Sequence, residues 1–166
     1  MGIYLNPENV DFQEVLNSKI YVDKSELIQY TNSVLRTTQK YICVSRPRRF
    51  GKSMAANMLT AYYSRGCDSR KLFQGLKIAT HPDFEKHLNQ YNVIHLNMQN
   101  FLSKTQTIEQ MIALVTKAVG RDLLRAYPDV DYLDKTILTF MLDDIYQDCQ
   151  VPFIFIIDEW DYIFRS

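Results

Sequence analysis

The sequence has few cysteines and no long hydrophobic run, and both absences narrow the class of protein. Its three cysteines, Cys43, Cys67 and Cys149, are odd in number and widely spaced, so they predict neither a disulfide framework nor a zinc site. No apolar run approaches the roughly 18 residues of a membrane-spanning helix, and no secretory signal opens the chain. We therefore expect a soluble protein of the reducing cytoplasm with no membrane partner.

An excess of either charge is also missing, because 19 lysines and arginines balance 19 aspartates and glutamates. A chain with this balance is not a general binder of nucleic acid or of membrane surfaces. Its 166 residues are 46% apolar, which is enough for one domain with a hydrophobic core.

Glycine is scarce, and one is missing from a motif that normally needs it. Residues 45–53 read Ser-Arg-Pro-Arg-Arg-Phe-Gly-Lys-Ser. Gly51, Lys52 and Ser53 match the second half of a phosphate-binding loop, or Walker A motif. In such a loop, backbone N–H groups and a helix N-terminus surround a polyphosphate, the lysine meets the terminal phosphates and the serine joins Mg2+. Arg46 stands where the pattern asks for its first glycine.

The flanking sequence places this motif between a strand and a helix. Residues 41–45 form an apolar run with β-branched members, which is typical of a buried parallel strand. After the motif, apolar residues recur at helical spacing up to a stop signal at 64–66: Met54, Met58, Leu59 and Tyr62. This order favours a phosphate loop over the alternative, in which residues 46–49 are only a solvated turn.

The motif contains four cations in the seven residues 46–52, namely Arg46, Arg48, Arg49 and Lys52. Three interpretations remain open for them. They neutralise a triphosphate, which we favour, or they pair with acids such as Asp158 in the empty state, or they contact nucleic-acid phosphates.

Two acids follow directly after a second apolar run, at residues 153–157. The run predicts a buried strand, and the carboxyl ends of strands in open α/β sheets are where ligands bind. We therefore expect Asp158 to face Lys52 and hold Mg2+, as in a Walker B motif. Glu159 would polarise the water that attacks the γ-phosphate.

Together these motifs resemble the bacterial AAA-ATPase-like family. The resemblance rests on residues 45–53, on Tyr-Val-Asp-Lys-Ser at 21–25 and on Ile-Ile-Asp-Glu-Trp-Asp at 156–161, and it extends from about residue 10 to the end. It implies that Arg46 is the family's own form of the loop. Trp160 stands where the family usually has tyrosine. Members commonly carry a PD-(D/E)XK nuclease-like domain after the ATPase part.

The rest of the chain predicts a single P-loop NTPase-type domain, a three-layer α/β/α fold with a mostly parallel sheet. A helical lead-in covers about residues 1–38, with a short helix at 11–16 and a second helix that Asp23 and Glu26 open as a capping pair. The core at 39–166 has the order βαβααβ, with its second strand over Val93 to Leu96, helices from Thr107 and over about 132–149, and a third strand at 153–157.

Several side chains near these elements are weaker candidates. Asn97 is expected at the edge of the sheet near the metal, whereas His95 has no partner at metal-ligand spacing and is interpreted as a core histidine. Tyr21 and Tyr30 are either contacts of the nucleotide base or, more commonly for tyrosine, core residues.

The sequence stops eight residues after Asp158. A working P-loop ATPase normally has two more strands, a polar sensor and an arginine that stabilises charge on the γ-phosphate. We therefore expect a fragment, truncated after the Walker B strand, whose partners are the missing C-terminal region or a second copy of the chain. Nucleic acid would be reached only through the longer parent protein.

The predicted function is binding of ATP with Mg2+ and, in the intact protein, ATP hydrolysis. Lys52 and Glu159 are the catalytic candidates, and Ser53 and Asp158 are the candidate metal ligands. The candidates for contact with the nucleotide are Arg46, Pro47, Arg48, Arg49, Phe50, Gly51, Lys52, Ser53 and Met54. Alternatives are a nucleotide-operated switch, a non-binding interaction fragment, and a small-molecule kinase, which the roughly 45 residues before the loop disfavour.

Overall fold

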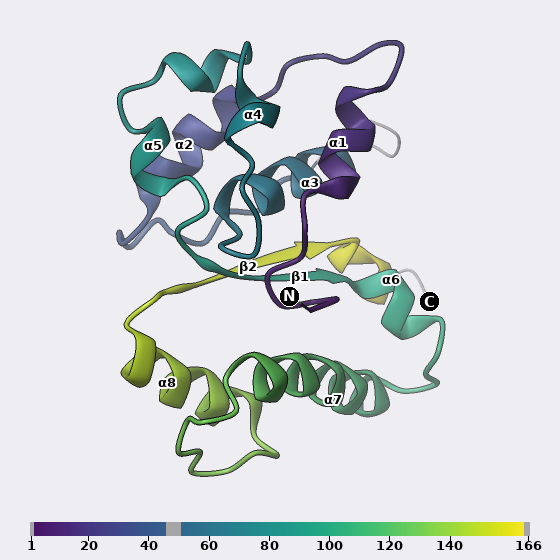
Figure 1. Ribbon diagram of the computed structural model, residues 1–166. Coiled ribbons are helices and arrows are strands. Elements are labelled where there is room, and N and C mark those ends of the chain that lie inside the picture. Colours follow the sequence, from purple (N-terminus) through teal and green to yellow (C-terminus); the bar gives the residue numbers. More distant parts are fainter. Residues whose placement is uncertain (1, 46–50, 165–166) are drawn as a thin grey trace.

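The computed structural model describes residues 2–45 and 51–164. Helices lie on both faces of a small parallel sheet (Figure 1). The elements in chain order are α1 (Val10–Leu16), α2 (Glu26–Val34), α3 (Lys52–Tyr63), α4 (Arg70–Phe73), η1 (Lys77–Thr80), α5 (Phe84–His87), β1 (Asn92–Asn97), α6 (Met98–Leu102), α7 (Ile108–Ala126), α8 (Leu138–Cys149), β2 (Phe153–Asp158) and η2 (Trp160–Phe164).

The sheet pairs β1 with β2 in parallel, from Asn92 opposite Phe153 to Asn97 opposite Asp158. The crossover that a parallel pair requires is supplied by α6, α7 and α8. The other edge of β1 pairs with the N-terminal segment, where the Asn6 N–H donates to the Val93 carbonyl over 2.7 Å. The mixed α/β class, the two strands and their parallel pairing are therefore confirmed.

The two faces of β1 belong to different layers. Helices α1 to α5 lie above the sheet in Figure 1, and α7 and α8 lie below it. Side chains alternate between the faces of a strand, so Val93 packs with the upper helices while Ile94 and Leu96 pack with α7 and α8. Helices thus cover both sides of the sheet.

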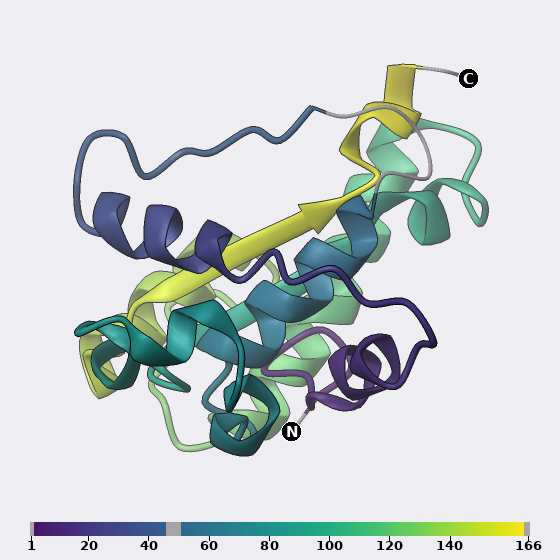
Figure 2. The ribbon, with the colours of Figure 1, turned by 90° about the horizontal axis from the view of Figure 1, so that it is seen from above.

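The prediction of a first strand at residues 41–45 is wrong. These residues form no strand, and Tyr41 is 86% exposed. A strand needs a neighbour that supplies ladder hydrogen bonds, and among the described residues none pairs with this segment. Figure 2 shows this segment running in roughly the same direction as β2. The expected order βαβααβ therefore reduces to one parallel pair, and the larger sheet of a P-loop fold remains a prediction.

The last strand is present but is buried less completely than expected. Phe155 and Ile157 are 45% and 47% exposed, and Ile154 and Ile156 are only partly buried. All four side chains line a cavity together with the unpaired segment, so β2 is not a fully buried strand.

Local sequence signals predicted some helix starts correctly and others wrongly. The Thr107 side chain caps α7 by accepting the Gln110 N–H over 3.2 Å, as expected. Asp23 does not cap α2, since Ser25 occupies that position and Asp23 accepts its N–H instead. Helix α8 begins at Leu138 rather than near 132, because Asp134 accepts the N–H and hydroxyl of Thr136 in a local turn. Within the described ranges, no helix is both long and apolar enough to span a membrane.

Candidate functional site

The start of α3 is shaped by Gly51. This glycine is the N-cap residue, with φ +76° in the left-handed region that favours glycine. The first N–H groups of a helix lack intrahelical partners and carry partial positive charge, so they attract anions. Lys52 is the first residue of α3 and adds a full positive charge at this end. The predicted nucleotide contacts Arg46, Pro47, Arg48, Arg49 and Phe50 lie outside the described residues.

The two predicted acids sit where β2 leaves the sheet. Asp158 is the last residue of the strand and is only 8% exposed. Its Oδ1 accepts the Glu159 N–H over 2.9 Å, and Glu159 has φ +54°, so the backbone turns sharply toward η2. The turn holds the Asp158 carboxylate at the carboxyl edge of the sheet.

One cavity of about 710 Å³ brings the lysine and the acids together. Lys52 lines it from the start of α3, and Asp158 and Glu159 line it from the end of β2. The unpaired segment and the exposed side of β2 form its apolar walls. Ser53 is exposed and does not line this cavity, and Met54 lines a different pocket. The geometry thus joins Lys52, Asp158 and Glu159, and leaves the roles of Ser53 and Met54 as predictions.

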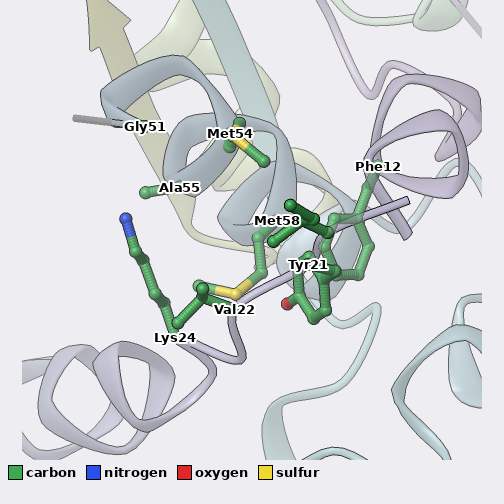
Figure 3. A pocket seen from close by; sticks show the side chains of 9 residues that line it. Phe12, Tyr21, Val22, Lys24, Gly51, Met54, Ala55 and Met58 are labelled. Atoms are coloured by element: carbon green, nitrogen blue, oxygen red, sulfur yellow. The ribbon is translucent and has the colours of Figure 1, made fainter. Parts of the chain in front are cut away.

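A second pocket of about 320 Å³ lies on another side of the α3 N-terminus (Figure 3). Its walls are mainly apolar and include Phe12, Tyr21, Met54 and Met58. Tyr21 therefore lines the same pocket as Gly51, whereas Tyr30 is exposed and lines neither pocket. Burial, together with nearby Asp23, raises the pKa of Tyr21, so its phenol stays protonated at neutral pH.

Lys24 also lines this second pocket, and it was missed among the site residues predicted from the sequence. A Cβ added to Gly51 would lie 2.9 Å from Lys24 Nζ. The available signal was its place in the Tyr-Val-Asp-Lys-Ser string at 21–25, one of the three strings that carried the family resemblance.

Asn97 lies at the expected edge of the sheet, directly opposite Asp158 in the strand register. Its side-chain oxygen is engaged by the Gln99 N–H, which caps α6. His95 is partly buried, and this burial lowers its pKa although nearby Asp158 acts in the opposite direction. In the part of the chain that the structure describes, no three His, Cys, Asp or Glu side chains are grouped to hold a metal ion.

Comparison with protein families gave one informative match. A family model described as a predicted AAA-ATPase matches residues 10–165. A search of curated proteins gave no match, and a search of solved structures gave none either. The matched range covers nearly the whole sequence and includes the motif at 51–53 and both acids. The chain therefore belongs to the AAA-ATPase-like family.

Proposed function

We propose that this chain binds ATP with Mg2+ and that, in the intact protein, the same site hydrolyses the γ-phosphate. The observation that carries the proposal is the shared cavity, in which Lys52 from α3 lies with Asp158 and Glu159 from the end of β2. The sequence separates these groups widely, and the fold places them around one space. Membership of the AAA-ATPase-like family supports the same ligand class.

The positive side of the cavity suits a polyphosphate. Lys52 and the N-terminus of the 12-residue helix α3 both favour negative charge. In the proposed complex the Lys52 ammonium binds phosphate oxygens, and the backbone N–H groups from residue 48 to Ser53 surround them. Arg46 and the other cations of the loop, with Phe50 and Met54 beside them, complete this contact. The apolar pocket around Tyr21 would receive the base.

The acidic side suits Mg2+, which prefers oxygen ligands and is commonly held by one or two protein groups together with phosphates and water. The Asp158 carboxylate would hold the ion, and the Ser53 hydroxyl, from the first turn of α3, would be the second protein ligand. When bound, the ion would neutralise charge on the phosphate oxygens. The Glu159 carboxylate would orient the attacking water and accept its proton.

Two substitutions test these roles. Lys52→Ala removes a charged hydrogen-bond donor, and we expect ATP affinity to fall roughly 10- to 100-fold. Glu159→Gln keeps the shape of the side chain but removes its basicity, so we expect unchanged binding and a fall in phosphate release of about 100-fold or more. Calorimetric titration with Mg-ATP gives the first quantity, and a phosphate-release assay on the intact protein gives the second.

Matched controls use exposed residues of α7 that do not line the cavity. Lys117→Ala and Glu109→Gln make the same chemical changes and should leave both quantities unaltered. Equal ATP affinity in the Lys52 variant and the parent would contradict the phosphate-loop assignment. Binding without release would favour a nucleotide-operated switch, and release that requires an added acceptor would favour a kinase. An absence of binding would favour an interaction segment.

A further inference from the structure

Lys24 approaches the start of α3 from the lead-in, a part of the sequence separate from the phosphate loop. Gly51 has no side chain, and a Cβ added to it would lie 2.9 Å from the Lys24 Nζ. The ammonium group therefore lies in the space that the side chain of any other residue would need. Figure 3 shows the side chain extending from the lead-in toward Gly51 and Ala55. A second ammonium group therefore reaches the helix N-terminus from which Lys52 also projects.

The backbone around Lys24 is anchored on both sides. The Asp23 carboxylate accepts the N–H of Ser25 and the N–H of Lys77, each over 2.8 Å. Ser25 Oγ accepts the Ile78 N–H over 3.1 Å, and the Lys24 carbonyl accepts the Leu27 N–H over 3.0 Å. These hydrogen bonds tie residues 23–25 to η1 and to the start of α2. Because the backbone is already ordered, less conformational freedom is lost when the ammonium binds an anion.

Two cations lie beside the positive end of α3. Lys24 approaches Gly51, and Lys52 follows Gly51 as the first residue of the helix, while Asp158 and Glu159 line the cavity of Lys52. Two ammonium groups and a helix N-terminus attract a ligand that carries several negative charges. The triphosphate of a nucleotide has this property.

We propose that Lys24 is a second phosphate-binding lysine, which contacts the phosphates of the bound nucleotide from the side of the apolar pocket. Lys52 contacts them from the side of the larger cavity. This proposal rests on the proposed function, because it needs the nucleotide to occupy the start of α3. It adds a ligand-binding residue that lies outside the phosphate-loop motif.

The test compares nucleotides with different numbers of phosphates. Lys24→Met keeps the length of the apolar stem and removes the charge. In calorimetric titrations with ATP, ADP and AMP, we expect its ATP affinity to fall about 10-fold or more, and its AMP affinity to fall much less. Lys24→Arg restores the charge and should recover most of the ATP affinity. Lys19→Met changes an exposed lysine of the same lead-in and should match the parent.

The possible results separate this proposal from the one on which it rests. A parent protein that binds no ATP overturns both. A parent that binds ATP, with a Lys24→Met variant within twofold of it, overturns the role of Lys24 alone. Equal proportional losses for ATP and AMP indicate a structural role and also overturn it. Lys24→Gln provides a second neutral variant if thermal melting shows that Lys24→Met does not fold.

Discussion

At the scale of single residues, the ionisation of Asp23 is coupled to the position of Lys24. Burial alone would raise the pKa of the Asp23 carboxyl, but hydrogen bonds from Ser25 and Lys77, with the positive charge of Lys77, outweigh it and lower this pKa. A lowered pKa in the folded state means that the fold favours the ionised carboxylate. The anchoring of Lys24 therefore depends on an ionised Asp23.

The sign of the pH dependence follows from this shift. The stabilising contribution of Asp23 is complete above the pKa of an unfolded aspartate, about 3.9, and is lost as pH falls through the lower pKa of the folded state. We expect Asp23→Asn to lower the free energy of unfolding at pH 7 and to flatten its decline below about pH 4. Urea unfolding from pH 7 to pH 3 measures both effects.

Asp129→Asn, at an exposed site away from the lead-in, is the control for this experiment. An Asp23→Asn variant whose stability falls with acid as steeply as the parent's would contradict the assignment. In the same variant, weaker ATP binding is expected because Lys24 loses its anchor.

Sequence reasoning located some site residues and missed others for physical reasons. Lys52, Asp158 and Glu159 belong to motifs in which the residue types and their order carry the chemistry. Lys24 reaches Gly51 through the fold of the lead-in, and neither charge patterning nor periodicity reports such an approach. From the sequence, Tyr21 and Tyr30 were equal candidates for contact with the nucleotide base. Only their packing in the fold shows that Tyr21 lines a pocket and that Tyr30 is exposed.

At the scale of elements, a buried hydrogen-bond network joins α2 to α3. The Asn32 side chain donates to the Tyr62 hydroxyl over 3.1 Å and accepts from the Tyr63 hydroxyl over 2.6 Å. Burial raises the pKa of Tyr62 to about 12, although its hydrogen bond with Asn32 acts in the opposite direction. Asn32 is buried as well, and together with the Thr31 hydroxyl, which hydrogen-bonds the Tyr63 hydroxyl over 2.6 Å, it connects α2 to α3.

Removing this amide should destabilise the protein measurably. Asn32→Ala removes one of two hydrogen-bond partners from each tyrosine hydroxyl, since Tyr62 still donates to the Phe84 carbonyl and Tyr63 still bonds Thr31. For two lost buried hydrogen bonds we expect a fall of about 1–3 kcal/mol in the free energy of unfolding. Denaturant unfolding measures it. Ser33→Ala, on the exposed side of the same helix, is the control. A change of less than about 0.5 kcal/mol in Asn32→Ala would show that the Asn32 amide contributes little and that α2 is held to α3 by apolar packing and the Thr31–Tyr63 hydrogen bond.

The elements that the sequence predicted well are those whose signals are local. Helix α7 has its cap at Thr107 and its buried residues within one segment, and α3 has periodic apolar residues ahead of a stop signal. The segment at 41–45 has strand composition but no pairing partner among the described residues, and composition does not supply one. Strand formation depends on a distant neighbour, whereas helix formation depends on residues three and four positions away.

At the scale of the whole molecule, β1 joins two hydrophobic cores. Val93 packs with α1 to α5, and Ile94 packs with α7 and α8. Asp122 of α7 adds a link by accepting the Tyr4 N–H over 2.7 Å, which holds the N-terminal segment against β1. The sequence predicted β1 and its parallel partner, but nothing local indicated that residues 4–6 would cover its other edge. The shared strand implies that both layers unfold together.

Ile94→Ala tests this cooperativity. Ile94 is fully buried below the sheet, so its truncation should cost about 2–5 kcal/mol. We expect one unfolding transition at lower denaturant, with the same midpoint when followed by Trp160 fluorescence, by tyrosine signals of the upper layer and by helical circular dichroism. Ile112→Ala removes the same atoms from a side chain of α7 that is 56% exposed and should shift the midpoint far less. Separate midpoints among these probes would mean that the two layers do not unfold as one unit. In that case Lys52 and Lys24, which belong to the upper layer, would keep their arrangement after α7 and α8 had unfolded. A single transition means instead that the candidate site depends on both cores.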